Sequence, residues 1–274
     1  MSNSKIPDKI KKGILNSDNF ITINDLNKKF DIKRITASNY LSRLEKEGLI
    51  TRIGRGEYLS TQKSKLKPEI DQKIVEIHNL IKKNSPFLEF IIWSIFNFKE
   101  FFHNIPIKNY IFIEAQELFE LKAIKDRLFE NDIESIMDPN SKDFEEVSFR
   151  KEIPIFLFKR KNFYGIININ EIKTASSERC ILDLYYYITR KHLNYPIEEI
   201  KDTLIKMIQT GEFNFSFAMR YAKNRNIEFE VFLIISKLHN KLPNYIPKKF
   251  GENISNIKNN LNQFFGKGWA DGFF

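Results

Sequence analysis

The chain has 274 residues, of which 42% are hydrophobic and 29% are charged, a composition typical of a globular protein with one large or two ordinary domains. A single cysteine, Cys180, excludes an internal disulfide framework. Because the sequence has neither an apolar leader nor a long uncharged span, we expect a cytoplasmic protein. The formal net charge is +9, and its distribution is more informative than its size.

The excess positive charge is concentrated in the first quarter of the chain. Residues 1–67 hold 15 of the 44 Lys and Arg residues but only 7 of the 35 Asp and Glu residues, a net charge of +8. Residues 68–274 are nearly neutral at +1. A basic surface confined to one domain is typical of a nucleic-acid-binding protein. From charge alone, a basic solvated surface without a partner remains the alternative.

The first periodic segment predicts a short helix that begins after Thr22 and ends at Phe30. Thr22, followed three residues later by Asp25, is typical of an N-cap with an acidic residue in the first turn. Ile23, Leu26 and Phe30 share the inner side of this helix. A second helix is expected after a tight link.

The second helix is predicted within "TASNYLSRLEKEGL", residues 36–49. Ala37, Leu41 and Leu44 recur at helical spacing and form one buried stripe, and Gly48 is expected to end the helix in the left-handed conformation. The opposite face carries side chains that can reach base edges and phosphates. We assign to DNA binding the residues Arg34, Thr36, Asn39, Ser42, Arg43 and Lys46.

A short hairpin is predicted after this helix, with "LITRI" and "EYLS" as strands and "GRG" as the turn. Arg52 and Arg55 lie on or beside this hairpin, where they can contact a phosphate backbone or enter a minor groove. Helix, helix and hairpin in this order predict a winged helix-turn-helix that binds double-stranded DNA. Winged helices also act as protein-interaction modules, and that alternative stays open.

A polar, basic connector is predicted at residues 60–70, "STQKSKLKPEI". Beyond it, apolar runs such as residues 110–115 and 153–158 alternate with helical patterns, which indicates a mixed α/β domain. The expected fold class is therefore α/β (mixed α+β): a winged helix-turn-helix in residues 1–67 followed by a larger mixed α/β domain in residues 68–274.

Three segments resemble one known family. Residues 40–59, "YLSRLEKEGLITRIGRGEYL", are similar to the winged helix of abortive-infection antitoxins of the AbiE kind, the antitoxins of type IV toxin–antitoxin pairs. "SSERCILDLYYYI" (176–188) and "FNFSFAMRYAKNRN" (213–226) resemble two helices of that family's second domain. The sequence departs from the family at Glu57, where a small apolar residue is common.

The resemblance implies a function for each domain. The first would bind inverted repeats in the promoter of its own operon and repress it. The second would counteract a nucleotidyltransferase-like toxin without needing a stable complex. The antitoxin surface is assigned to charged residues of the two resembling helices: Glu178, Arg179, Asp183, Arg220, Lys223 and Arg225. Solvated helix faces or structural ion pairs are the alternative interpretation of these charges.

Two other function classes remain open. One is a one-component regulator whose second domain binds a small molecule. The other is a metal-dependent nuclease, in which Glu171 and Lys173 would form an acid-x-lysine pair and Glu114 a second carboxylate. The four histidines are scattered and, with one cysteine, give no metal-ligand spacing. We therefore expect no metal, no cofactor and no enzymatic activity.

Overall fold

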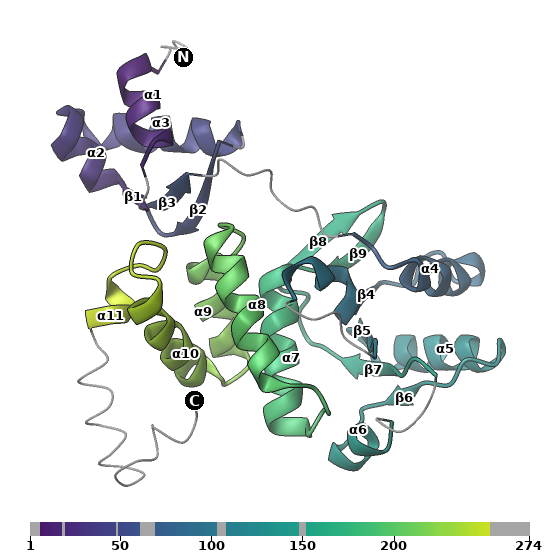
Figure 1. The fold of residues 1–274 in the computed structure, drawn as a ribbon. Helices are drawn as coiled ribbons and strands as arrows, with labels where there is room; N and C mark the ends of the chain where they lie inside the picture. Colours follow the sequence, from purple (N-terminus) through teal and green to yellow (C-terminus); the bar gives the residue numbers. More distant parts are fainter. Residues whose placement is uncertain are drawn as a thin grey trace, which may run out of the picture. The chain divides into compact units, whose positions relative to one another are not determined.

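The computed structural model describes residues 6–17, 20–47, 49–60, 69–102, 108–147 and 152–252 (Figure 1). It is a mixed α/β protein, as the sequence predicts. The chain divides into two compact units, one combining Met1–Lys65 with Met207–Phe274 and the other consisting of Leu66–Lys206. In the part of the chain that is described, no helix is long and apolar enough to cross a membrane.

This division differs from the expected boundary at residue 67. Residues 207–252, which we expected in the second domain, group with the N-terminal residues. The helix α9 (Phe215–Asn224) packs against the strand β2 (Ile50–Gly54). The backbone N–H of Phe20 also donates a hydrogen bond to the carbonyl oxygen of Asn244 at 3.3 Å. Most of the predicted connector, residues 61–68, lies outside the described residues.

The first unit begins with helices and a small sheet. Its N-terminal elements are α1 (Asp8–Leu15), β1 (Ile21–Thr22), α2 (Ile23–Phe30), α3 (Arg34–Lys46), β2 and β3 (Glu57–Ser60). The sheet has the order β1-β3-β2, with both pairings antiparallel. Its C-terminal helices are α9, α10 (Glu228–Lys241) and α11 (Lys249–Glu252). We did not predict α1, because its two buried residues, Ile10 and Ile14, give only a short periodic signal.

The start of α2 is fixed by a capping box, which confirms the prediction for Thr22. Its hydroxyl oxygen accepts a hydrogen bond from the backbone N–H of Asp25 at 3.1 Å, and the Asp25 carboxylate accepts one from the N–H of Thr22 at 2.9 Å. Two amide groups at the helix start are thereby satisfied. Gly48, expected to end α3, lies outside the described residues.

The buried stripe of α3 is also confirmed. Ala37, Leu41 and Leu44 are fully buried in a hydrophobic cluster that includes Leu26 of α2 and Ile50 of β2. Because this stripe is packed against both neighbours, the orientation of α3 about its axis is fixed.

The second unit is built on a four-stranded sheet. Its elements are α4 (Gln72–Asn84), β4 (Phe90–Ser94), the 3-10 helix η1 (Ile95–Phe101), β5 (Ile111–Ala115), α5 (Leu118–Phe129), β6 (Ile136–Met137), α6 (Ser141–Val147), β7 (Ile155–Lys159), β8 (Ile166–Ile169), β9 (Ile172–Ala175) and α7 (Ser177–Lys191). The order is β4-β5-β7-β6, with β4 antiparallel to β5 and the other pairings parallel. Strands β8 and β9 form a separate antiparallel pair, and α8 (Ile197–Gln209) follows α7.

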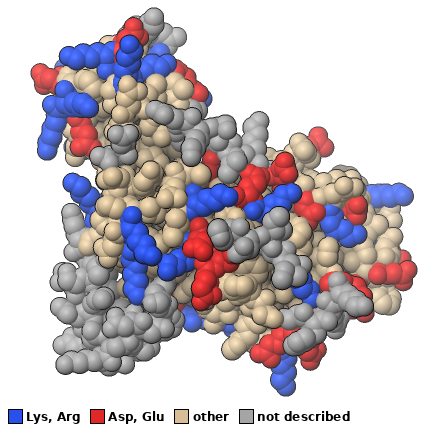
Figure 2. Space-filling view, viewed as in Figure 1, with Lys and Arg blue, Asp and Glu red and all other residues tan. Residues whose placement is uncertain are grey.

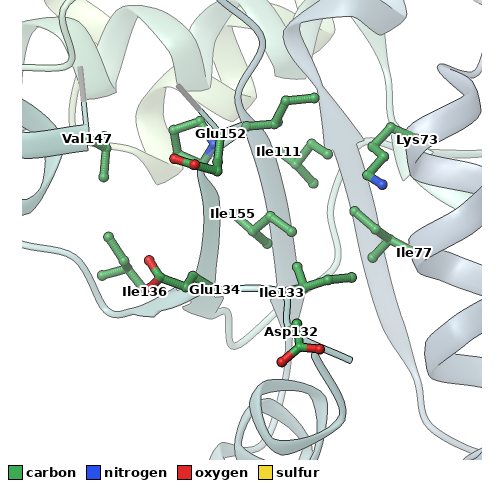
Figure 3. Close-up of a pocket in the computed structure, with 12 residues that line it drawn as sticks. Lys73, Ile77, Ile111, Asp132, Ile133, Glu134, Ile136, Val147, Glu152 and Ile155 are labelled. Atoms are coloured by element: carbon green, nitrogen blue, oxygen red, sulfur yellow. The ribbon is translucent and has the colours of Figure 1, made fainter. Parts of the chain in front are cut away.

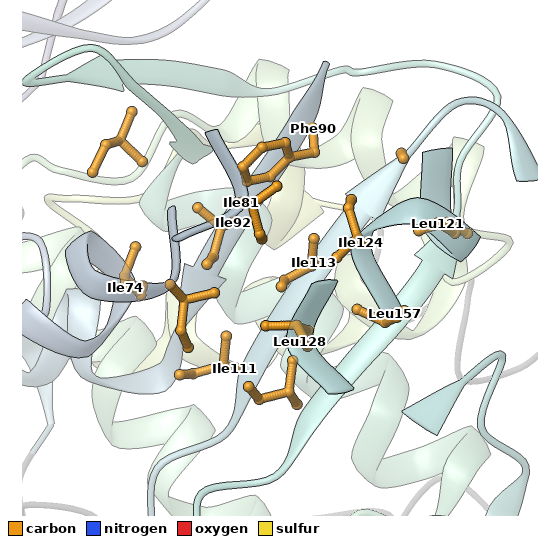
Figure 4. Close-up of a cluster of buried hydrophobic side chains, with 14 residues drawn as sticks. Ile74, Ile81, Phe90, Ile92, Ile111, Ile113, Leu121, Ile124, Leu128 and Leu157 are labelled. Atoms are coloured by element: carbon orange, nitrogen blue, oxygen red, sulfur yellow. The ribbon is translucent and has the colours of Figure 1, made fainter. Parts of the chain in front are cut away.

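The two faces of the four-stranded sheet differ in chemistry. One face is mainly aliphatic and packs against α4 and α5 (Figure 4), with the buried residues Ile74, Ile81, Phe90, Ile92, Ile113, Leu121, Ile124, Leu128 and Leu157. The other is aromatic: the ring of Phe112 stacks on that of Trp93 at 4.1 Å and on that of Tyr187 in α7 at 5.0 Å between centroids. Glu114 follows Phe112 by two residues in β5, so both side chains point to this face.

The turn between β2 and β3 depends on glycine at Gly56. Gly56 has φ +74°, a conformation that residues with a Cβ atom rarely adopt. A Cβ atom at Gly54 would overlap the carboxylate of Glu57, which lies against that glycine. Glycine is therefore required by backbone geometry at Gly56, whereas at Gly54 a Cβ atom would need only a movement of the Glu57 side chain.

We predict that Gly56→Ala lowers the free energy of unfolding by about 1 kcal/mol, because alanine is strained at positive φ. Denaturation by urea, followed by circular dichroism, measures this loss. Arg55→Ala is the control, since Arg55 is the other turn residue, is exposed, and has no positive φ. Equal stability of the two variants would contradict the requirement for glycine.

Candidate nucleic-acid interface

The outer face of α3 carries Asn39, Ser42, Arg43 and Lys46, with Thr36 at its edge, whereas Arg34, the first residue of the helix, is in phase with the buried stripe. Arg34, Asn39 and Lys46 are exposed, and Thr36, Ser42 and Arg43 are half-buried at the flanks. The buried stripe occupies the opposite side of the helix, so packing and polar surface are separated by helical geometry alone. An outer face with both amide and basic side chains has the donors and acceptors that base edges and phosphates require.

Ile35 is a surface residue of α3 that the sequence analysis missed. Its side chain is 75% exposed, although isoleucine is usually buried. It lies beside Arg34 and is out of phase with the buried stripe that begins at Ala37. Its position in the helical period could therefore have identified Ile35 as an exposed residue. An exposed apolar side chain on such a face is suited to contact with the methyl group of thymine.

The two arginines of the hairpin are both exposed. The Nε–H of Arg52 donates a hydrogen bond to the carbonyl oxygen of Gly54 at 3.1 Å, which holds this guanidinium against the hairpin. Arg55 lies in the turn itself. Within the described residues, neither arginine forms an ion pair. Their charges therefore remain available to an external anion.

Acidic side chains are interspersed with the basic ones around α1 to α3, as Figure 2 shows. Glu47, at the end of α3, is paired with Lys11 of α1 at 3.3 Å between Oε2 and Nζ. The pair is exposed and contributes little to stability. Its consequence is electrostatic, because Glu47 then opposes an approaching phosphate less strongly.

A hollow of about 620 Å³ lies between the β2–β3 hairpin and the start of α9. Its lining residues are Arg52, Gly54, Arg55, Asn214, Ser216, Met219, Arg220 and Lys249. The hollow thus brings together Arg52 and Arg55, predicted to contact DNA, with Arg220, predicted to face a toxin. Lys223 is exposed and Arg225 half-buried near the end of the same helix, and neither lines the hollow.

The three residues of α7 that we assigned to the antitoxin surface do not form an exposed surface, in contrast to our expectation. Arg179 and Asp183 are 1% and 0% exposed, and Glu178 is half-buried. They also belong to a different unit from Arg220, so the six predicted antitoxin residues do not share one unit. The reason for the burial is that α7 covers the aromatic face of the sheet, where Glu114 needs a cationic partner.

A network of two carboxylates and two guanidinium groups occupies this buried position. Arg179 pairs with Glu114, its Nε lies 3.4 Å from Oδ2 of Asp183, and it donates to the carbonyl oxygen of Tyr164 at 2.9 Å. Arg160, directly after β7, lies 3.4 Å from Glu114 through its Nε and 3.9 Å from Asp183 through a terminal nitrogen.

Aromatic side chains complete the network. A terminal N–H of Arg160 donates to the hydroxyl of Tyr187 at 2.7 Å, and the indole N–H of Trp93 donates to Glu114 at 3.3 Å. The two positive and two negative charges compensate each other where water is excluded. For Arg179 and Asp183 the structural ion pair, the alternative left open by the sequence, is therefore the interpretation that fits.

The three residues of the nuclease alternative are not brought together. Glu114 belongs to the buried network, and Lys173 is paired with Glu89. Glu171 is exposed in the β8–β9 turn with φ +67°. Among the described residues, no group of three or more Asp, Glu, His or Cys side chains could hold a metal ion.

A smaller hollow of about 240 Å³ lies in the second unit, at the N-terminal ends of β5 and β7 (Figure 3). Ile111 and Ile155 are part of its apolar lining, and Asp132, Glu134 and Glu152 carry acidic groups around it. In α/β sheets, ligands usually bind at the carboxyl ends of the strands. This hollow lies at the opposite ends, so it gives little support to the small-molecule sensor.

We predict that Arg179→Ala lowers the free energy of unfolding by about 3–5 kcal/mol, because it leaves Glu114 and Asp183 with too little positive charge in a buried site. Urea denaturation measures the loss. Arg190→Ala, at an exposed position of the same helix, should change it by less than about 0.5 kcal/mol. If Arg179→Ala lowered the free energy of unfolding as little as Arg190→Ala does, the network would not be structural.

The sequence was compared with known protein families and with curated proteins. A model of a family of unknown function, DUF6577, matches residues 36–241. The match begins in α3, includes the hairpin and the whole second unit, and ends at the last residue of α10. No curated protein matches the sequence. Since the model covers more than half of the chain, the protein belongs to the DUF6577 family.

Proposed function

We propose that residues 6–60 form a winged helix-turn-helix that binds double-stranded DNA. The observation that carries this proposal is the outer face of α3, which holds Asn39, Arg43 and Lys46 while the opposite side of the helix is packed in the core. The order α2, α3, β2 and β3 supports it, because that is the order of elements in a winged helix. Here α3 is the recognition helix and the β2–β3 hairpin is the wing.

Each side chain then has a role set by its chemistry. Arg43 donates two hydrogen bonds to one guanine, and Asn39 bonds one adenine edge in the same bidentate manner. Lys46 contacts a phosphate and positions the helix without reading sequence. Arg52 and Arg55 of the wing contact the flanking backbone or enter the minor groove.

We further propose that this DNA-binding protein is an antitoxin that represses its own operon and counteracts a nucleotidyltransferase-like toxin. Support comes from the resemblance to AbiE-type antitoxins, whose three quoted segments coincide with α3 and the hairpin, with α7 and with α9. Of the residues assigned to toxin neutralisation, Arg220 and Lys223 are exposed and Glu178 and Arg225 are half-buried, so these four remain candidates.

The first test concerns sequence reading. We expect Arg43→Ala to weaken binding to a selected DNA site by about 1–3 kcal/mol and to relax specificity at one base pair. Lys46→Ala should weaken binding to all sequences alike and reduce the salt dependence. Selection from random duplexes supplies the site, and fluorescence anisotropy at several salt concentrations measures both effects. Equal losses on selected and random DNA for both variants would refute base reading by Arg43.

The second test separates DNA binding from toxin neutralisation. Truncation at residue 67 is unsuitable, because residues 207–252 belong to the same unit as the N-terminal residues. We therefore use the double variant Arg43→Ala/Lys46→Ala of the whole chain, expressed from an independent promoter together with the nucleotidyltransferase-like toxin that this proposal expects beside the gene. We expect it to bind DNA poorly and to rescue growth as the unchanged protein does. Loss of rescue would mean that neutralisation acts through repression.

A further inference from the structure

The hollow beside the hairpin has walls from three elements that lie far apart in the sequence. Arg52 and Arg55 come from the hairpin, Arg220 from α9 and Lys249 from α11. Its lining contains four cationic side chains and no Asp or Glu. Arg55 and Arg220 are exposed, and neither has an ion-pair partner among the described residues. The structure thus places two exposed guanidinium groups without an ion-pair partner among the described residues in one concave place, next to two further cationic side chains.

The chemistry of this lining matches phosphate groups. A guanidinium group offers a planar fork of donors that fits two phosphate oxygens at once. The start of α9 also faces the hollow, with Asn214 and Ser216 in its lining. Oδ1 of Asn214 accepts a hydrogen bond from the N–H of Phe217 at 3.0 Å, and the positive end of the helix dipole adds to the attraction for an anion.

The form of the hollow favours a phosphate chain over a compact ligand. Pockets for small molecules are mostly apolar and enclose most of their ligand. This hollow is lined mainly by charged and polar side chains, and two of its four cations, Arg52 and Arg55, stand on the hairpin that the proposed function places at the DNA backbone. A DNA strand whose phosphates contact the hairpin can continue along the walls of the hollow.

We propose that this hollow holds the phosphate backbone of DNA, so that α9 and α11 form part of the DNA interface together with the hairpin. The proposal rests on the proposed function, which it extends to the C-terminal helices of the first unit. Arg220, assigned from the resemblance to the toxin-facing surface, is then a phosphate contact. The C-terminal helices thereby widen the DNA footprint beyond the winged helix.

Glu57 supplies an opposing charge at the edge of this site. Its side chain lies against Gly54, and its Oε2 atom is buried and accepts no hydrogen bond within the described residues. Burial raises the pKa of this carboxyl, and the positive charge of Lys249 lowers it in part. A carboxylate beside a phosphate site weakens binding, so removal of its charge should strengthen it.

The test measures the affinity of the full chain for a 30-base-pair duplex of random sequence at several salt concentrations. We expect Arg220→Ala to reduce the slope of log Kd against log salt by about 0.9, the value for one lost phosphate contact. Lys223→Ala is the matched control, because it removes one charge from the same helix outside the hollow. It should leave the slope unchanged. Glu57→Gln should tighten binding, and Arg220→Lys should restore most of the slope.

The outcomes separate this inference from the function on which it rests. If Arg220→Ala leaves the slope unchanged while Arg43→Ala/Lys46→Ala loses binding, the inference is wrong and the DNA-binding function stands. If the unchanged protein binds no duplex, the inference and the proposed function both fail.

Calorimetric titration with inorganic pyrophosphate tests whether the hollow binds a free phosphate compound instead of DNA. Binding of pyrophosphate that depends on Arg220, with unchanged affinity for DNA in Arg220→Ala, would assign the hollow to a free ligand and overturn our proposal.

Discussion

The burial of one apolar stripe on α3 is the constraint on which the proposed interface depends. Ala37, Leu41 and Leu44 can leave water only when they face α2 and β2, and this packing fixes the rotation of α3 about its axis. The polar residues between them are then held on the outer side. Asn39 and Lys46 need no other support to be presented, since the core positions them through the helix backbone.

In the second unit, the charges of α7 are used to balance a carboxylate. Glu114 lies on the aromatic face of the sheet, where an isolated negative charge would cost several kcal/mol. Arg179 and Arg160 remove that cost, and Asp183 balances the second guanidinium. The same residues would carry free charge on an open surface, but here they form a neutral group. Charged residues in a helix therefore indicate a binding surface only when the helix does not cover a buried charged group.

The sequence was sufficient to predict features that depend on neighbouring residues. The capping box at Thr22, the buried stripe of α3 and the hairpin after it all follow from spacings of a few residues. The alternation of α4 to β7 likewise predicted a mixed α/β fold. Each of these features is decided by local hydrogen bonding or by the period of apolar residues, which a single sequence contains.

Features that depend on contacts distant in the sequence were not predicted. The partner of Arg179 is Glu114, 65 residues earlier, and no local pattern relates the two. The same holds for Arg55 and Arg220, which line one hollow although the whole second unit lies between them in the chain. A net charge of +8 in residues 1–67 suggested that the interface ends there, because charge was summed along the chain rather than in space.

The N-terminal and C-terminal segments of the first unit depend on each other, which is a physical reason to treat that unit as one functional domain. The family match begins in α3, passes through the second unit and ends in α10, so it includes part of each of the two segments that build the first unit. Residues 6–60 alone would lose the packing of α9 against β2, and with it the support on one side of the hairpin. An arginine that contacts a phosphate must be held by a rigid element to bind it strongly. The C-terminal helices therefore supply the hairpin with both support and further positive charge.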